Sequence, residues 1–81
     1  MTVRTEDFER HRSLLFSIAY RMLGSVADAE DVVQETYLRW RDVPETEVRS
    51  PRSYLSAMVT RLSINRLRSA RARGVHWSLA A

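Results

Sequence analysis

The stretch SVADAEDVVQETYLRW, residues 25–40, decides how this chain folds. Ser25 and Asp28 have the S-x-x-D spacing of a capping box, which marks the start of an α-helix. Apolar residues then recur at intervals of 3, 4, 4 and 3 residues, so they form one stripe along that helix: Val26, Ala29, Val33, Tyr37 and Trp40. The stretch therefore predicts a helix that ends near Trp40 and buries one side.

A helix is also predicted before this stretch. It should begin near Thr5, whose side chain can cap the first turn. Gly24 supplies the left-handed conformation that commonly ends a helix. The apolar residues that recur at helical spacing between these ends are Phe8, Leu15, Ile18, Ala19 and Met22.

A third helix is predicted after residue 50. Pro44 disfavours helix in the residue before it, so Asp42 to Arg49 should form a polar loop. Ser50 and Pro51 then provide a cap and a proline at the first helical position. The helix can run to about Arg73, and its core-facing arc contains Leu55, Met58, Val59 and Leu62, with Leu67 at the edge.

These patterns predict an all-α protein, a small three- to four-helix bundle. The chain has 81 residues with only two Gly and two Pro, which suits one helical domain and leaves little turn chemistry for a many-stranded fold. We expect a domain over residues 1–73 and a C-terminal tail over 74–81. No apolar run approaches the roughly 20 residues of a membrane span, so no membrane partner is expected.

The composition argues against catalysis and metal binding. Cys is absent, and His11 and His76 have no companion at ligand spacing. No Ser/His/Asp set, glycine-rich phosphate loop or paired-carboxylate site stands out. We therefore expect no enzyme activity, no metal and no cofactor. We interpret the chain as a cytoplasmic protein, because it contains no cysteine and its N-terminus has no signal-peptide pattern.

Charge is strongly segregated along the chain. Residues 1–47 contain ten acidic residues and six arginines, a net charge of −4, whereas residues 48–81 contain seven arginines and no acid. A basic block of this kind is typical of chains that bind polyanions, although it is also compatible with a solvated basic face.

An acidic face is predicted on the second helix. Asp31, Gln34, Glu35 and Leu38 lie at i, i+3, i+4 and i+7, so they share a side that differs from the apolar stripe. This face has the chemistry to dock a basic partner helix. An ordinary solvated acidic face is the alternative.

A basic face is predicted on the third helix. Tyr54, Arg61, Asn65 and Arg68 lie within about 60° of one another. Arginine pairs with phosphate or guanine edges, asparagine reaches base edges, and a tyrosine ring stacks on an unpaired base. A basic amphipathic helix that binds a membrane surface or an acidic protein is the alternative. Neither Ile64 nor Arg66 is explained by the pattern, because Ile64 points away from the core arc and Arg66 points along it.

Taken together, these stretches resemble region 2 of extracytoplasmic-function (ECF) RNA polymerase sigma factors. The resemblance begins at FERHRSLLFSIAYRMLG, residues 8–24, continues through DAEDVVQE, residues 28–35, and ends in the segment 50–73. That last segment is similar to the subgroup that carries a SnoaL-like C-terminal extension. The resemblance implies the helical fold of sigma factor region 2.

The resemblance also implies partners and site residues. In the family, the second helix docks on the β′ clamp helices of core RNA polymerase, and the matching positions here are Asp31, Gln34 and Glu35, with Leu38 beside them. The last helix and the loop before it open the minus-ten promoter element and hold an extruded base of the non-template strand. The matching loop is about Asp42 to Ser53, and the matching helix face is Tyr54, Arg61, Asn65 and Arg68. We expect further DNA-binding arginines at the two ends of this region, Arg49 and Arg52 at the loop and Arg71 and Arg73 toward the end of the helix.

We therefore expect a sigma factor domain in bacterial transcription initiation. Further expected partners are an anti-sigma factor and C-terminal domains of the same protein. A helical protein–protein adaptor with a basic face is the main alternative. A helix-turn-helix repressor fits less well, because that motif needs a turn of about three or four residues and the loop from Asp42 to Ser50 is longer.

Overall fold

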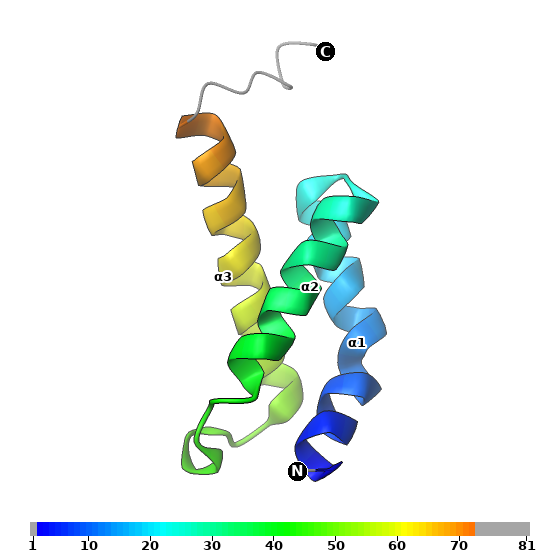
Figure 1. The fold of residues 1–81 in the computed structure, drawn as a ribbon, viewed down its shortest axis with the longest axis vertical. Helices are drawn as coiled ribbons and strands as arrows, with labels where there is room; N and C mark the ends of the chain where they lie inside the picture. Colours follow the sequence, from blue (N-terminus) through cyan, green and yellow to red (C-terminus); the bar gives the residue numbers. More distant parts are fainter. Residues whose placement is uncertain (1, 73–81) are drawn as a thin grey trace.

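A computed structural model describes residues 2–72 of the chain, and these residues form helices joined by short connections (Figure 1). The α-helices are α1 (Thr2–Leu23), α2 (Val26–Trp40) and α3 (Pro51–Ala72), and a 3-10 turn, η1 (Glu45–Glu47), interrupts the loop between α2 and α3. No strand occurs in the described part. The expected all-α bundle is confirmed, while the predicted tail over residues 74–81 lies outside the described residues.

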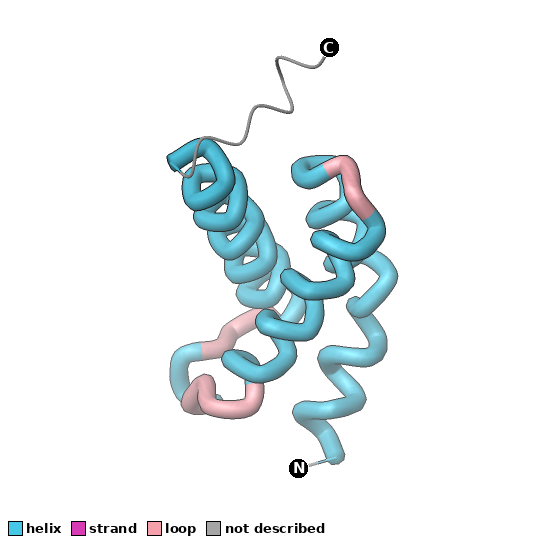
Figure 2. The backbone as a smooth tube through the Cα atoms, turned by 45° about the horizontal axis from the view of Figure 1, so that its top comes forward, coloured by secondary structure: helices cyan, strands magenta, loops and turns pink. Residues whose placement is uncertain are grey.

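Each α-helix packs against the other two. Figure 1 shows α1 and α2 running in opposite directions, with α3 returning alongside them after the loop. The contact is uneven along α3, because its buried residues, Leu55, Val59, Leu62 and Ser63, all lie in its first 13 positions. The C-terminal turns of the helix, orange in Figure 1, extend away from the other two helices, and Figure 2 shows the same divergence.

The core is a single cluster of apolar side chains from all three helices. Its buried members are Phe8, Leu15, Ala19, Ala29, Val32, Val33, Trp40, Leu55, Val59 and Leu62. Ile18, Tyr37 and Met58 pack against it while remaining partly exposed. Most of the residues expected in the core are therefore confirmed there.

The apolar stripe of α2 differs from the prediction at its first turn. Val26 is 54% exposed, whereas Val32 and Thr36 are buried. An α-helix turns about 100° per residue, so one buried side includes positions 29, 32, 33, 36 and 40. Val26 lies at the edge of that side in the first turn. Thr36 is accommodated because its hydroxyl donates a hydrogen bond to the Val32 carbonyl oxygen at 2.8 Å.

Trp40 ties the end of α2 to the start of α1. Its indole Nε1 donates to the Arg4 carbonyl oxygen at 3.0 Å, and an Arg4 guanidinium nitrogen donates to the Trp40 carbonyl oxygen at 2.8 Å. The guanidinium carbon also lies 4.6 Å from the centre of the indole ring, a cation–π geometry. This reciprocal pair fixes the point from which the α2–α3 loop departs.

The connection between α1 and α2 follows the sequence closely. Gly24 has φ of 72°, the left-handed conformation expected at the end of a helix. The Ser25 hydroxyl accepts a hydrogen bond from the Asp28 backbone N–H at 3.2 Å, so the predicted cap is confirmed. At the other end, α1 begins at Thr2, earlier than the expected start near Thr5. Within residues 2–72, no helix has the combined length and apolar character that crossing a membrane requires.

Candidate partner-binding and nucleic-acid-binding faces

The predicted acidic face lies on the outer side of α2. Asp31, Gln34 and Leu38 are exposed, and Glu35 is partly exposed. Leu38 retains 43% exposure, which is high for a leucine. An apolar group surrounded by carboxylates and an amide suits a protein partner, since an apolar contact then adds to the polar ones.

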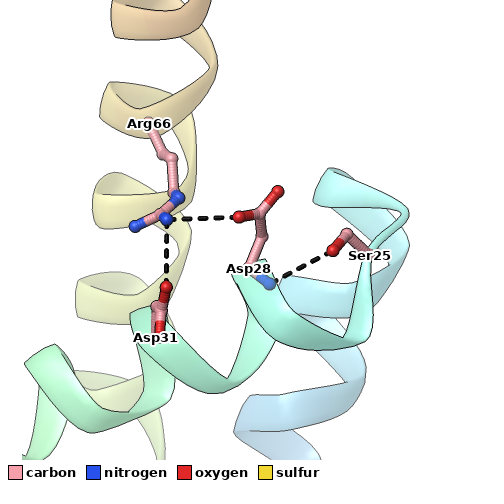
Figure 3. Close-up of polar contacts among 4 residues, drawn as sticks. All are labelled: Ser25, Asp28, Asp31 and Arg66. Atoms are coloured by element: carbon pink, nitrogen blue, oxygen red, sulfur yellow. Dashed lines mark hydrogen bonds and ion pairs between the residues drawn. The ribbon is translucent and has the colours of Figure 1, made fainter.

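Both carboxylates of this face, Asp31 and Glu35, form an ion pair with an arginine. The Arg39 guanidinium contacts Glu35 at 2.9 Å across one turn of α2. Arg66 of α3 contacts Asp31 at 3.1 Å and also contacts Asp28, in the first turn of α2, at 3.1 Å. Figure 3 shows Arg66 reaching from α3 to the two aspartates. The acidic face is thus partly neutralised within the domain.

Sequence reasoning missed this role of Arg66. The helical spacing placed Arg66 on the core arc of α3, where a charged group had no explanation. The structure accounts for it, because α3 has begun to leave the core at this level and the guanidinium, partly exposed, meets the two aspartates of α2. The sequence did show a positively charged residue on the core-facing arc of the helix. Its partners, Asp31 and Asp28, lie 35 and 38 residues away in the chain, so helical spacing could not identify them.

The predicted basic face lies on α3 and is open to solvent. Arg61, Asn65, Arg68 and Arg71 are all exposed. Among residues 2–72, Arg61 and Arg68 have no ion-pair partner, so their guanidinium groups remain available to a phosphate. Arg73, which was expected to join this face, lies outside the described residues.

Tyr54 stands apart from the exposed arginines. Its side chain is only partly exposed, and its ring centre lies 6.0 Å from that of Trp40 in a tilted arrangement. The ring therefore supports the end of α2 on one side. Only the outer part of the Tyr54 ring is left for a nucleotide base. This stacking surface is smaller than the sequence pattern alone implied.

The loop before α3 presents exposed charges of both signs, including Glu45, Glu47 and Arg49. Arg49 and Arg52 are exposed at the end of the loop and in the first turn of α3. Beneath η1, Arg4, Trp40, Glu45 and Val48 line a hollow. The backbone here is short and anchored, because Val43 and Val48 both pack against the core.

A groove separates α2 from α3 where the two faces meet. Glu35 and Arg39 line it from α2, and Asn65 and Arg66 line it from α3, above a floor that includes Val32 and Leu62. Acidic and basic faces are therefore adjacent, and Arg66 lies on their boundary. No group of three or more potential metal ligands gathers anywhere in the described residues.

Comparison with known proteins agrees with this arrangement. Sigma-70 region 2 matches residues 8–73 of the chain. The chain is 50% identical over 68 residues to the ECF RNA polymerase sigma factor SigJ of Mycobacterium tuberculosis, covering 84% of this chain and 22% of SigJ. It is 39% identical over 71 residues to the ECF sigma factor SigL of the same species, covering 84% of this chain and 40% of SigL.

A third relative is the probable ECF sigma factor SigI of M. tuberculosis, 35% identical over 63 residues, with 78% of this chain and 22% of SigI covered. The chain thus spans a fifth to two fifths of the length of these relatives. No solved structure matches it significantly. The chain belongs to the sigma-70 region 2 family, and its curated relatives are sigma factors of the ECF type.

Proposed function

We propose that this chain binds core RNA polymerase through α2 and opens the minus-ten promoter element with α3 and the loop before it. The observation that carries the proposal is the separation of charge between two helices that pack against each other in one bundle. The outer side of α2 presents Asp31, Glu35 and the exposed Leu38. The α3 helix contains five arginines and no acid.

The proposed mechanism converts binding free energy into strand opening and needs no covalent chemistry. Unstacking a base step costs a few kcal/mol. Stacking an extruded base on an aromatic ring returns about 1–3 kcal/mol, and arginine contacts with phosphate add a salt-dependent contribution. With one half-buried tyrosine on α3, this domain offers little stacking surface of its own. Opening several steps therefore requires polymerase as a second source of binding free energy.

In this proposal the two sets of residues have separate tasks. Asp31, Gln34, Glu35 and Leu38 hold the β′ clamp helices. Arg61 and Asn65, with the outer part of Tyr54, receive the extruded base, because they precede Arg68 and Arg71 along α3 and so lie nearer the loop. The arginines farther along α3 follow the phosphate backbone, and Arg49 and Arg52 hold it beside the loop. The assignment to the SnoaL-like subgroup, an anti-sigma partner and the domain boundary at residue 73 stay predictions.

A binding experiment tests the docking assignment. The double variant Asp31→Arg, Glu35→Arg should lose binding to a β′ clamp-helix fragment, because a basic partner would meet like charges on α2. Affinity is measured by fluorescence anisotropy of the labelled fragment at low and moderate salt. Circular dichroism checks that helix content is unchanged.

The matched control reverses two acids on α1. Glu6 and Glu9 are both exposed, so Glu6→Arg, Glu9→Arg changes the net charge equally and leaves α2 intact. The control should bind within about twofold of the wild type, the scale of screened surface charge effects. Equal binding by the α2 variant and the wild type would refute docking through this face.

A further inference from the structure

Arg66 occupies a distinctive position between the two proposed interfaces. One of its guanidinium nitrogens, Nη2, lies 3.1 Å from Asp28 Oδ1 and 3.1 Å from Asp31 Oδ2 (Figure 3). The Asp31 side chain remains 64% exposed in this contact, and that of Asp28 45%. A partner that approaches the outer side of α2 can therefore reach the Asp31 carboxylate, and there it meets Arg66 as a second cation for the same group.

The ion pair also lies where α3 leaves the core. Ser63 is the last buried residue of the helix, and beyond it Arg66, Leu67 and Ala70 are only partly covered. Leu67 borders a shallow hollow beside Leu23 and Gly24. Beyond Ser63, the Arg66 ion pairs and the partial burial of Leu67 and Ala70 hold the last turns of α3, which carry Arg68 and Arg71.

We propose that Arg66 is a positioning residue that competes with core polymerase for the Asp31 carboxylate. Docking on α2 then leaves Arg66 with Asp28 alone and loosens the hold on the last turns of α3, beyond Ser63. This inference rests on the proposed docking function of α2. In the proposed function, the two faces act through separate residues. The inference adds an energetic coupling between them.

Linkage makes the coupling reciprocal. If the Arg66–Asp31 pair weakens docking by some factor, docking weakens that pair by the same factor. Exposed ion pairs contribute modestly, so the factor is about two- to fivefold. Asp28 lowers it, because a second carboxylate keeps part of the Arg66 charge away from Asp31.

The test measures affinity for the β′ clamp-helix fragment in four proteins: wild type, Arg66→Gln, Asp28→Asn and the double variant. We expect Arg66→Gln to bind about two- to fivefold more tightly. Asp28→Asn should bind up to about twofold more weakly, because Arg66 then relies on Asp31. In the Arg66→Gln background, Asp28→Asn should have no effect. Removal of a residue that only supports the fold should weaken binding or leave it unchanged, and the double variant separates competition from simple charge repulsion.

Two controls separate this coupling from general charge effects and from misfolding. Arg10→Gln on α1 makes the same change in net charge at another exposed position, and it should leave the affinity within the error of the wild type. Arg66→Lys keeps one positive charge without the planar fork of guanidinium donors. Its affinity should lie between those of the wild type and Arg66→Gln, which provides a second reading if Arg66→Gln folds poorly.

Hydrogen exchange gives an independent measurement. In the wild type, binding of the fragment should speed amide exchange over residues 66–70, since the ion pair that holds this part of α3 weakens. In Arg66→Gln the exchange should already be faster and should not respond to the fragment. Protection that is unchanged or increased on docking in the wild type would overturn the coupling.

The outcomes distinguish the inference from the function on which it rests. If the charge-reversal variant at Asp31 and Glu35 keeps its affinity, docking through α2 fails, and the competition fails with it. If that variant loses binding while Arg66→Gln binds no more tightly than the wild type, docking stands and only the competition is refuted. An equal effect of Asp28→Asn with and without Arg66 would likewise refute it, because a general electrostatic attraction would then explain the result.

Discussion

Ser63 is a buried hydroxyl residue in α3, and within the described part of the chain its Oγ has no hydrogen-bond partner. Leaving a buried polar group unpaired costs about 1–3 kcal/mol. Alanine also favours a helix over serine by up to about 0.5 kcal/mol. We therefore expect Ser63→Ala to raise the free energy of unfolding by about 1 kcal/mol, measured by urea denaturation followed by circular dichroism.

Ser69 offers a matched control on the same helix, because its side chain is exposed. Ser69→Ala should raise the free energy of unfolding only by the propensity difference, up to about 0.5 kcal/mol. Equal gains for the two variants would show that the Ser63 hydroxyl forms a hydrogen bond in solution.

Arg61 and Asn65 are predicted to read bases. Replacing either with Ala should change which minus-ten sequences are preferred, at a cost of about 1–3 kcal/mol for the favoured base where the contact is direct. A promoter-library selection with core polymerase measures the preference. An unchanged preference in both variants would mean that the two residues only position the DNA and that the Asp42–Ser53 loop selects the sequence.

Arg71 is the comparison for that selection, since it is exposed near the end of α3. Arg71→Ala should weaken binding about equally for all sequences. It should also flatten the log–log salt dependence by roughly one unit. The Arg61 and Asn65 variants should therefore change the sequence preference, whereas the Arg71 variant should change the salt dependence.

At the scale of an element, Gly24 sets the turn between α1 and α2. Its φ is 72°, and a Cβ atom added there would meet no heavy atom within 4 Å. The cost of Gly24→Ala is therefore conformational, about 1–2 kcal/mol for a left-handed residue with a side chain. Thermal and urea denaturation should both show this loss of stability.

Asparagine at the same position is the control, because it adopts the left-handed conformation more readily than alanine. Gly24→Asn should recover part of the stability that Gly24→Ala loses. A Gly24→Ala variant as stable as the wild type would show that the turn relaxes to another conformation.

The helices were predictable from sequence because their start and stop signals are local. Ser25 caps α2 and Gly24 ends α1, as their residue types indicate. The assignment of Val26 to the buried stripe was wrong. Helical spacing gives the direction in which a side chain points, but it does not show whether a neighbouring helix extends far enough to cover that side chain. The pairing of Arg66 with Asp28 and Asp31 depends on the crossing of α2 and α3, which no local pattern contains.

The candidate faces were predictable in part for the same reason. Exposure of Asp31, Gln34 and Leu38 follows from helical spacing, and the structure places them on the outer side of α2 as expected. The contact of Tyr54 with Trp40 did not follow from spacing, because it depends on how the loop returns α3 to the end of α2.

For the whole molecule, the two proposed interfaces imply that polymerase and DNA bind together. The complex with core polymerase should prefer a single strand of the non-template minus-ten sequence over the same sequence as duplex. The reason is that a duplex must first be unstacked, at a few kcal/mol per step. Competition binding with labelled single strand and unlabelled duplex measures the preference.

A scrambled single strand of the same composition controls for charge. It should bind more weakly than the minus-ten strand, with a similar salt slope. Equal affinity for single strand and duplex would favour a repressor that reads closed DNA. No binding to either, with retained binding to an acidic protein, would favour the adaptor alternative.

The pairing of Trp40 with Arg4 has a practical consequence for spectroscopy. The chain contains two tryptophans, Trp40 and Trp77, so Trp77→Phe leaves one intrinsic fluorophore. That indole is 2% exposed, lies beneath a guanidinium group and neighbours a tyrosine of the third helix. Its emission should shift to longer wavelength when any of the three helices separates. The fluorescence of Trp40 therefore reports on the packing of the helices without an added dye.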